Sequence, residues 1–224
     1  MEANTSAQRD TKTRILDAAE ILFAENGYKR TSIKALACRA RVNLAAVNYH
    51  FGSKHALVEK VIERRLSLIN DLRMEKFQQI EEAAARNGRA PCVQALLRAF
   101  IEPVFTATDT LQKGVSFLMI EGRAFAEPDH AIRDIFIHHF KPAFTRLSSL
   151  MQAALPDLPA PVLRWRLHFV IGAFAHALRV CGSRPAPDFF PPVYQAGTVV
   201  SLLVAFLAHG MTAPHLPEDG PSGI

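Results

Sequence analysis

The chain has 224 residues, of which 49% are hydrophobic and 21% are charged. This composition excludes an intrinsically disordered chain, a collagen-like repeat and a disulfide-rich scaffold. The formal net charge of +5 is unevenly distributed, because the first 65 residues carry twelve basic and seven acidic side chains and the remaining 159 carry fourteen of each. A cationic end on an otherwise neutral chain indicates that this end binds a polyanion.

The N-terminal part of the chain is predicted to form four helices. Apolar residues recur at helical spacing between positions 11 and 27, and Gly27 is a suitable residue to end that helix. Two short helices are predicted at 32–40 and 44–51, and a long helix is predicted at 54–85. Three short helices bury little surface by themselves, so we expect them to pack against later parts of the chain.

The rest of the chain is also predicted to be helical. Proline-rich boundaries separate apolar segments at about 91–107, 110–126, 128–154, 160–181 and 191–209. No alternating pattern predicts a strand, so the fold class is all-α. We expect an N-terminal domain at 10–56, a larger helical domain at 57–211, and disordered ends at 1–9 and 212–224.

No segment resembles a membrane anchor or a secretory signal. The longest apolar run, Val199–Ala208, is much shorter than the ~20 residues that a spanning helix needs, and the polar N-terminus lacks an apolar core. The three cysteines (Cys38, Cys92 and Cys181) are far apart in the sequence, which favours reduced thiols. We therefore expect a cytoplasmic protein that does not bind a membrane.

The second and third predicted helices have the dimensions of a helix-turn-helix unit. In such a unit the third helix enters the DNA major groove, where Asn48 can pair with adenine and alanines can contact a thymine methyl group. The candidates for base recognition are Leu44, Ala45, Ala46 and Asn48. Side chains at two helix N-termini suit phosphate oxygens, and these candidates are Thr31, Ser32, Tyr49, His50 and Lys54.

These residues resemble the DNA-binding domain of the TetR family of transcriptional regulators over about 12–65. The resemblance is carried by Ile15-Leu16-Asp17-Ala18-Ala19-Glu20, Phe23-Ala24-Glu25-Asn26-Gly27-Tyr28, Thr31-Ser32-Ile33 and Val47-Asn48-Tyr49-His50-Phe51-Gly52-Ser53-Lys54. It implies a dimeric, mostly repressing regulator whose C-terminal domain binds a small-molecule inducer. It also implies base contacts by Asn43, Leu44, Ala45, Ala46 and Asn48, and phosphate contacts by Thr31, Tyr49, His50 and Lys54.

One residue departs from the family pattern. Arg41 stands where the family usually has a glycine that ends the second helix. A left-handed backbone at a non-glycine residue costs ~1 kcal/mol. Either Arg41 adopts that conformation or the turn differs, and an exposed Arg41 would add a phosphate contact.

A weaker resemblance points to the PsrA-like subgroup of fatty-acid-responsive repressors. It rests on residues 42–54 and on Gly122-Arg123-Ala124-Phe125-Ala126-Glu127-Pro128. This resemblance implies a fatty acid or an acyl-CoA as the inducer.

Thirteen of the fifteen phenylalanines come after residue 65, and they form either a plain core or the wall of an apolar cavity. We expect a cavity for a small apolar effector lined by Phe100, Val104, Met119, Arg123, Phe140, Phe144, Trp165, Phe169 and Gly172. In it Arg123 would bind a carboxylate or phosphates. Alternatively, Arg123 pairs internally with Glu121, Glu127 or Asp134.

The sequence contains no catalytic motif. It has no paired nucleophile and base, no phosphate-binding loop and no metal-binding motif, so we expect neither an enzyme, a metal site nor a cofactor. Five histidines occur in the second domain (His130, His138, His139, His168 and His176). His168 and His176 are interpreted as polar groups in a cavity or an interface.

Small residues suggest two flat helix faces that form a homodimer interface. The candidates are Gly172, Ala173, Ala175 and Ala177 on one helix, and Ala196, Gly197, Val200, Leu203, Val204 and Leu207 on the other. A two-fold interface there would hold two third helices about 34–36 Å apart, which is one turn of B-DNA. The alternative is packing within one chain.

Together these features predict a ligand-responsive repressor whose dimer binds a palindromic double-stranded operator. The alternatives are an activator or dual regulator of the same family, or a non-catalytic adaptor whose basic domain binds an acidic protein.

Overall fold

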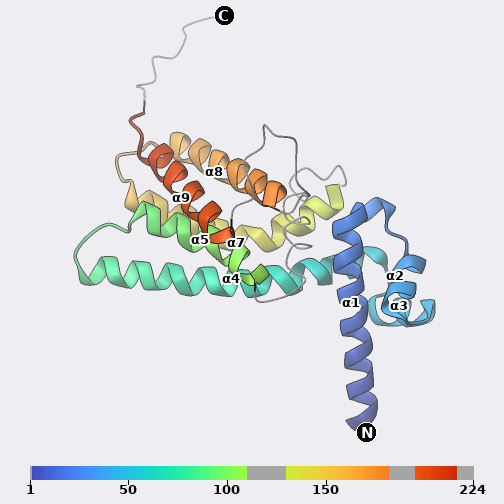
Figure 1. Ribbon diagram of the computed structural model, residues 1–224. Helices are drawn as coiled ribbons and strands as arrows, with labels where there is room; N and C mark the ends of the chain where they lie inside the picture. Colours follow the sequence, from blue (N-terminus) through green and yellow to red (C-terminus); the bar gives the residue numbers. More distant parts are fainter. Residues whose placement is uncertain (1, 110–129, 182–194, 216–224) are drawn as a thin grey trace, which may run out of the picture.

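The computed structural model describes residues 2–109, 130–181 and 195–215, and all regular secondary structure in these ranges is α-helical (Figure 1). The helices are α1 (Glu2–Arg30), α2 (Ile33–Ala40), α3 (Leu44–Phe51), α4 (Lys54–Arg86), α5 (Val93–Asp109), α7 (His130–Ala154), α8 (Ala160–Cys181) and α9 (Ala196–Thr212). The predicted all-α fold class is confirmed. The helix predicted at 110–126 lies outside the described residues.

The first helix is longer than the sequence predicted. It begins at Glu2, so residues 2–9, which we expected to be disordered, are helical. No glycine or proline interrupts this stretch, and alanine, glutamate and arginine favour a helix. At the other end Gly27 has φ 76° and ψ 171°, which breaks the helical path before Tyr28.

A side chain caps the first turn of each of the next three helices. The cap satisfies one of the backbone N–H groups that the first turn leaves without a helical partner. The three bonds are Ala35 N to Ser32 Oγ (3.1 Å), Ala46 N to Asn43 Oδ1 (2.7 Å) and Ala56 N to Ser53 Oγ (3.0 Å). These caps set the starts of α2, α3 and α4.

Tertiary packing stabilises the short helices. A helix of two turns is marginal by itself in water. In the N-terminal domain, α3 buries Val47 and Phe51, which belong to the same apolar cluster as Phe23 of α1 and Leu36 of α2. The opposite face of α3 is left exposed.

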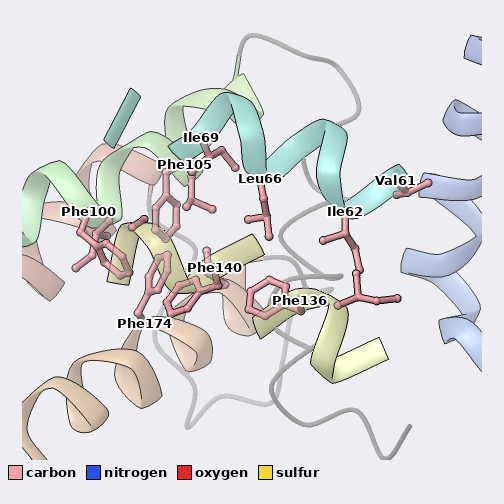
Figure 2. Packing of buried hydrophobic residues seen from close by; sticks show 14 of the residues in the cluster. Val61, Ile62, Leu66, Ile69, Phe100, Phe105, Phe136, Phe140 and Phe174 are labelled. Atoms are coloured by element: carbon pink, nitrogen blue, oxygen red, sulfur yellow. The ribbon is translucent and has the colours of Figure 1, made fainter. Parts of the chain in front are cut away.

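The long helix α4 connects the N-terminal domain to the rest of the molecule (Figure 1). It packs against α5 and α7, while α9 packs against α5 and α8. Figure 2 shows apolar side chains of α4 facing a group of aromatic rings from α5, α7 and α8, namely Phe100, Phe105, Phe136, Phe140 and Phe174. Apolar side chains of α4 are therefore part of the same core as these aromatic rings.

Among the described helices, none combines the length and the apolar character that a membrane crossing requires.

Candidate nucleic-acid interface

The turn between α2 and α3 keeps the left-handed backbone despite the absence of glycine. Arg41 has φ 56° and ψ 47°, and it is the one non-glycine residue with positive φ in the described part of the chain. Its N–H donates to Cys38 O at 3.1 Å. Arg14 of α1 donates from Nη2 to Ala40 O (2.6 Å) and to Arg41 O (2.7 Å), and so satisfies carbonyls at the end of α2. Of the two possibilities for Arg41, a left-handed backbone or a different turn, the structure shows the left-handed backbone.

The exposed face of α3 carries most of the predicted base-recognition residues. Leu44 is 50% exposed, and Ala45 and Asn48 are also exposed, whereas Ala46 is half-buried. Positions 44, 45 and 48 lie within one side of the helix because successive residues are 100° apart. This side is free to enter a groove, and Asn48 presents both an amide donor and an acceptor there.

Asn43 has a structural role that was not predicted for it. It is the N-cap of α3, and its Oδ1 accepts the Ala46 N–H. The cap also fixes the Asn43 side chain at the N-terminus of α3, beside the exposed face. The signal was present in the sequence, because asparagine is among the preferred N-cap residues.

Four of the five phosphate candidates are at least partly exposed, and one is buried. Tyr49 is 77% exposed, Ser32 is exposed, and His50 and Lys54 are half-buried. Thr31 is only 2% exposed, and its hydroxyl lies 3.0 Å from Leu22 O and 2.9 Å from Gly27 O. The expected phosphate contact of the Thr31 hydroxyl is therefore corrected to a structural role, because this group ties the end of α1 to the start of α2.

The residues predicted to line an effector cavity fall into three places instead of one. Phe100, Val104 and Phe140 belong to the buried core, whereas Trp165, Phe169 and Gly172 lie on the exposed side of α8. Phe144 lies between these groups, half-buried and 5.7 Å from the Phe140 ring. Met119 and Arg123 lie outside the described residues. The described candidates thus do not share one lining, because apolar residues occur on both the inner and the outer side of α8.

An open groove of about 770 Å³ lies between α7 and α8. Its walls combine the edge of Phe144 with hydroxyl, amide and basic groups, namely Thr145, Ser148, Ser149, Gln152, Arg164 and His168. Trp165 and Pro161 border a smaller hollow of about 250 Å³ next to it. His168 borders both hollows, while His176 is exposed on α8.

A buried arginine in the core was not anticipated from the sequence. Arg73 of α4 is 0% exposed; its Nε donates to Phe100 O at 2.8 Å, and its guanidinium carbon lies 4.2 Å from the centre of the Phe100 ring. Nη1 of Arg73 donates to Asn70 Oδ1 at 3.1 Å, and Asn70 Nδ2 donates to His139 O at 2.8 Å. These bonds anchor α4 to both α5 and α7.

Metal-binding groups do not converge among the residues that the structure describes. No group of three or more histidine, cysteine, aspartate or glutamate side chains there is arranged to hold a metal ion.

Four large apolar side chains are exposed on the adjacent helices α8 and α9, and we call the exposed side of these two helices their outer face. Trp165 and Phe169 are 65% and 64% exposed, and Leu202 and Phe206 are 57% and 73% exposed on the adjacent helix. Val200, Val204 and Leu207, which we had expected at a dimer interface, are buried in the core of their own chain. On α9 the expected interface residues therefore lie on the inner side of the helix, and the exposed side carries Leu202 and Phe206 instead.

A helix-turn-helix unit with an exposed α3, joined by one long helix to a larger helical domain, defines a DNA-binding regulator of the helix-turn-helix class. The model for bacterial regulatory proteins of the tetR family matches residues 15–61. The model for the tetracyclin repressor-like C-terminal domain matches residues 98–210, half of the chain. The chain therefore belongs to the TetR family of bacterial transcriptional regulators.

Several curated regulators are similar to parts of the chain. The regulator UidR of Escherichia coli is 41% identical over 58 residues, which cover 26% of this chain and 29% of UidR. The repressor Rv3405c of Mycobacterium tuberculosis is 35% identical over 97 residues, 42% of this chain and 51% of that protein. The repressor KstR2 of Rhodococcus jostii is 27% identical over 118 residues, 53% of each chain. The matched part thus spans about half or less of these relatives.

Solved structures share the fold over most of the chain. The fatty acid degradation regulator FadR of Bacillus halodurans has a TM-score of 0.68 at 14% identity, covering 90% of this chain and 96% of FadR. FadR of Bacillus subtilis in complex with stearoyl-CoA has a TM-score of 0.62 at 14% identity, covering 88% and 98%. At these identities the likeness concerns the fold.

Proposed function

We propose that the chain is a ligand-responsive transcriptional repressor that binds a palindromic operator as a homodimer and is released by an apolar small molecule. The observation that carries the proposal is the exposed face of α3, where Leu44, Ala45 and Asn48 project from a helix whose other side is held in the core. Two of the relatives, Rv3405c and KstR2, are named as repressors, which supports the direction of regulation.

On DNA, α3 reads bases and the groups around it bind the backbone. The Asn48 amide accepts and donates one hydrogen bond each, which matches N6 and N7 of adenine. The methyl group of Ala45 packs on a thymine methyl. Tyr49, Ser32 and Lys54, which are exposed or half-buried, contact phosphates, which sets the register without selecting sequence.

The homodimer forms through the outer face of α8 and α9. Four large apolar side chains exposed on two adjacent helices are unusual for a monomer in water, and a second copy of the chain would cover them. A two-fold axis through this face presents two α3 helices to successive major grooves of a palindromic site. The dimer therefore explains both the apolar face and the recognition of an operator.

The effector is a fatty acid or an acyl-CoA that binds in the C-terminal domain. The aromatic core next to α4 offers an apolar environment, and FadR of Bacillus subtilis, which has the same fold, was solved with stearoyl-CoA. Release from DNA requires that the effector bind more tightly to the arrangement whose α3 helices no longer match the groove spacing. Movement of α4 relative to α5 and α7 links the two sites.

Selection from a random DNA library with the purified full-length chain tests DNA recognition. We expect one palindromic motif, and Asn48→Ala reduces discrimination at one base pair of each half-site by about 1–3 kcal/mol. The exposed α4 variant Gln79→Ala is the matched control and leaves the motif unchanged. No enriched motif, or an unchanged base ranking with Asn48→Ala, contradicts the proposal.

The effector is tested on the same complex. Mass spectrometry of small molecules that copurify with the protein identifies the bound class, and stearoyl-CoA or stearate is then titrated into the protein–operator complex. We expect release of DNA at low micromolar ligand. Copurification of a sugar-like molecule, with no effect of either acyl compound, overturns the fatty-acyl assignment but leaves DNA recognition intact.

A further inference from the structure

A charged cluster joins α1 to α4. Glu20 of α1 is 0% exposed, although it carries a carboxylate. Arg64 Nη2 donates to its Oε2 at 2.6 Å, and Arg65 donates to its Oε1 from Nη2 (2.7 Å) and from Nε (3.0 Å). Arg64 Nη1 also donates to Asp17 Oδ1 at 3.0 Å, one turn earlier on α1. We call these four residues the α1–α4 clamp.

The geometry of the clamp restricts rotation as well as separation. Neighbouring residues of a helix point about 100° apart, so Arg64 and Arg65 approach the Glu20 carboxylate from two directions. The Arg65 contact is a two-pronged fork with fixed directions, whereas apolar contacts between the same helices have no directional preference. The clamp thus selects one orientation of α1 on α4.

The clamp lies close to the place where α4 is anchored to the C-terminal domain. Asn70 and Arg73 of α4 bond to the backbone of α7 and α5, at His139 O and Phe100 O. Arg65 and Asn70 are five residues apart, or ~7.5 Å along the helix axis. Figure 1 shows α1 crossing α4 at the end nearest α2 and α3. Asn70 and Arg73, which anchor α4 to the C-terminal domain, thus lie within about two helical turns of the clamp. A displacement of α4 at these two residues therefore also displaces α1.

We infer that Glu20 is a positioning residue that locks the reading head, α1 to α3, in one orientation on α4. Because the orientation is fixed, the dimer binds tightly only to operators with one half-site spacing. For the same reason, a movement of α4 moves α3 with it as a rigid unit. The inference rests on the proposed function, since it assigns a role within operator binding. It predicts that weakening the clamp broadens the spacing that the dimer accepts, in addition to any loss of affinity.

The test uses the full-length protein and the operator selected by the wild-type chain, together with operators whose half-sites are moved by one or two base pairs. Glu20→Gln removes the charge while keeping the size of the side chain. Glu63→Gln is the matched control, because Glu63 makes an exposed pair with Lys60 on α4 itself (2.5 Å). Arg65→Lys keeps the positive charge but removes the paired N–H donors of the guanidinium. It is the alternative variant if Glu20→Gln does not fold.

The wild type and Glu63→Gln are expected to lose about tenfold or more in affinity for each base pair of displacement, because one base pair rotates a half-site by about 35°. Glu20→Gln and Arg65→Lys are expected to lose less than about threefold. An equal fall in affinity at every spacing means that the clamp only stabilises the fold, and it overturns the inference. The inference is also overturned if Glu20→Gln and Arg65→Lys depend on half-site spacing as strongly as the wild type does. Failure of the wild type to select any operator instead overturns the proposed function and the inference together.

Discussion

The Lys54 ammonium nitrogen lies 4.2 Å from the centre of the Tyr28 ring. This contact joins the end of α1 to the first residue of α4. A cation at a helix N-terminus is unfavourable, because the helix dipole is positive there. The electron-rich face of Tyr28 offsets this repulsion, and we propose that it holds the ammonium group in position for a DNA phosphate.

Removing the Tyr28 ring is expected to weaken DNA binding without changing its sequence preference. Tyr28→Leu loses about 0.5–1 kcal/mol of affinity, the usual size of a partly exposed cation–π contact. Tyr28→Phe keeps the ring and retains most of the affinity. Fluorescence anisotropy with operator and unrelated DNA measures both variants. Equal affinities of the leucine and phenylalanine variants contradict the role of the ring.

The left-handed residue Arg41 provides a test of backbone strain. Arg41→Gly and Arg41→Ala both remove the guanidinium, but only glycine adopts φ 56° without a steric penalty. We expect the glycine variant to be more stable than the alanine variant by about 0.5–1 kcal/mol in the free energy of unfolding, after the greater freedom of the unfolded glycine chain is included. Urea titration followed by circular dichroism gives this difference. An alanine variant at least as stable as the glycine variant means that the turn carries no strain.

The exposed aromatic face predicts how the dimer responds to charge. Phe206→Glu places a carboxylate in the apolar face of α8 and α9, and an unpaired charge in a dry interface costs several kcal/mol. Sedimentation velocity at micromolar concentration is expected to show a dimer for the wild type and a monomer for the variant. Gln79→Glu adds the same charge to an exposed position on α4 and leaves the dimer intact. A dimeric Phe206→Glu variant means that another surface forms the interface.

The three cysteines are expected to react at different rates. Burial raises the pKa of the Cys181 thiol, whereas Cys38 and Cys92 are exposed. The thiolate is the reactive form, so at pH 8 iodoacetamide modifies Cys38 and Cys92 before Cys181. The rate at Cys181 rises only as the pH exceeds the ordinary thiol range. Peptide mass spectrometry over a time course measures this order, and faster labelling of Cys181 contradicts it.

The local features of the reading head were predictable from the sequence. Ser32, Gly52 and Ser53 are short-range signals whose capping or turn chemistry involves residues no more than four positions away. The start of α3 after Asn43 and its end before Gly52 were therefore expected correctly. The exposure of Asn48 and Tyr49 is also expected from local periodicity, once Val47 and Phe51 are assigned to the core.

The contacts between distant segments were not predictable in this way. Arg14 of α1 donates to the Ala40 and Arg41 carbonyls, 26 and 27 positions away, and nothing in its local sequence indicates these partners. Arg73 is buried with its Nε on Phe100 O, although an arginine in a helix is usually exposed. In α9 the same apolar pattern contains both the buried Val204 and the exposed Phe206. Periodicity alone does not indicate which apolar side of this helix packs against its own chain and which is left exposed.

The amino-acid sequence alone thus settles that the chain is helical and that its basic N-terminal part carries a helix-turn-helix unit, because caps, turns and charge act over short distances. Tertiary structure alone decides which apolar side of α8 and α9 is left uncovered. It also decides that Glu20 is reached by both Arg64 and Arg65, more than forty residues away. The physical reason is that side chains so far apart in the sequence meet only after α1 has packed across α4, and no local preference encodes that crossing.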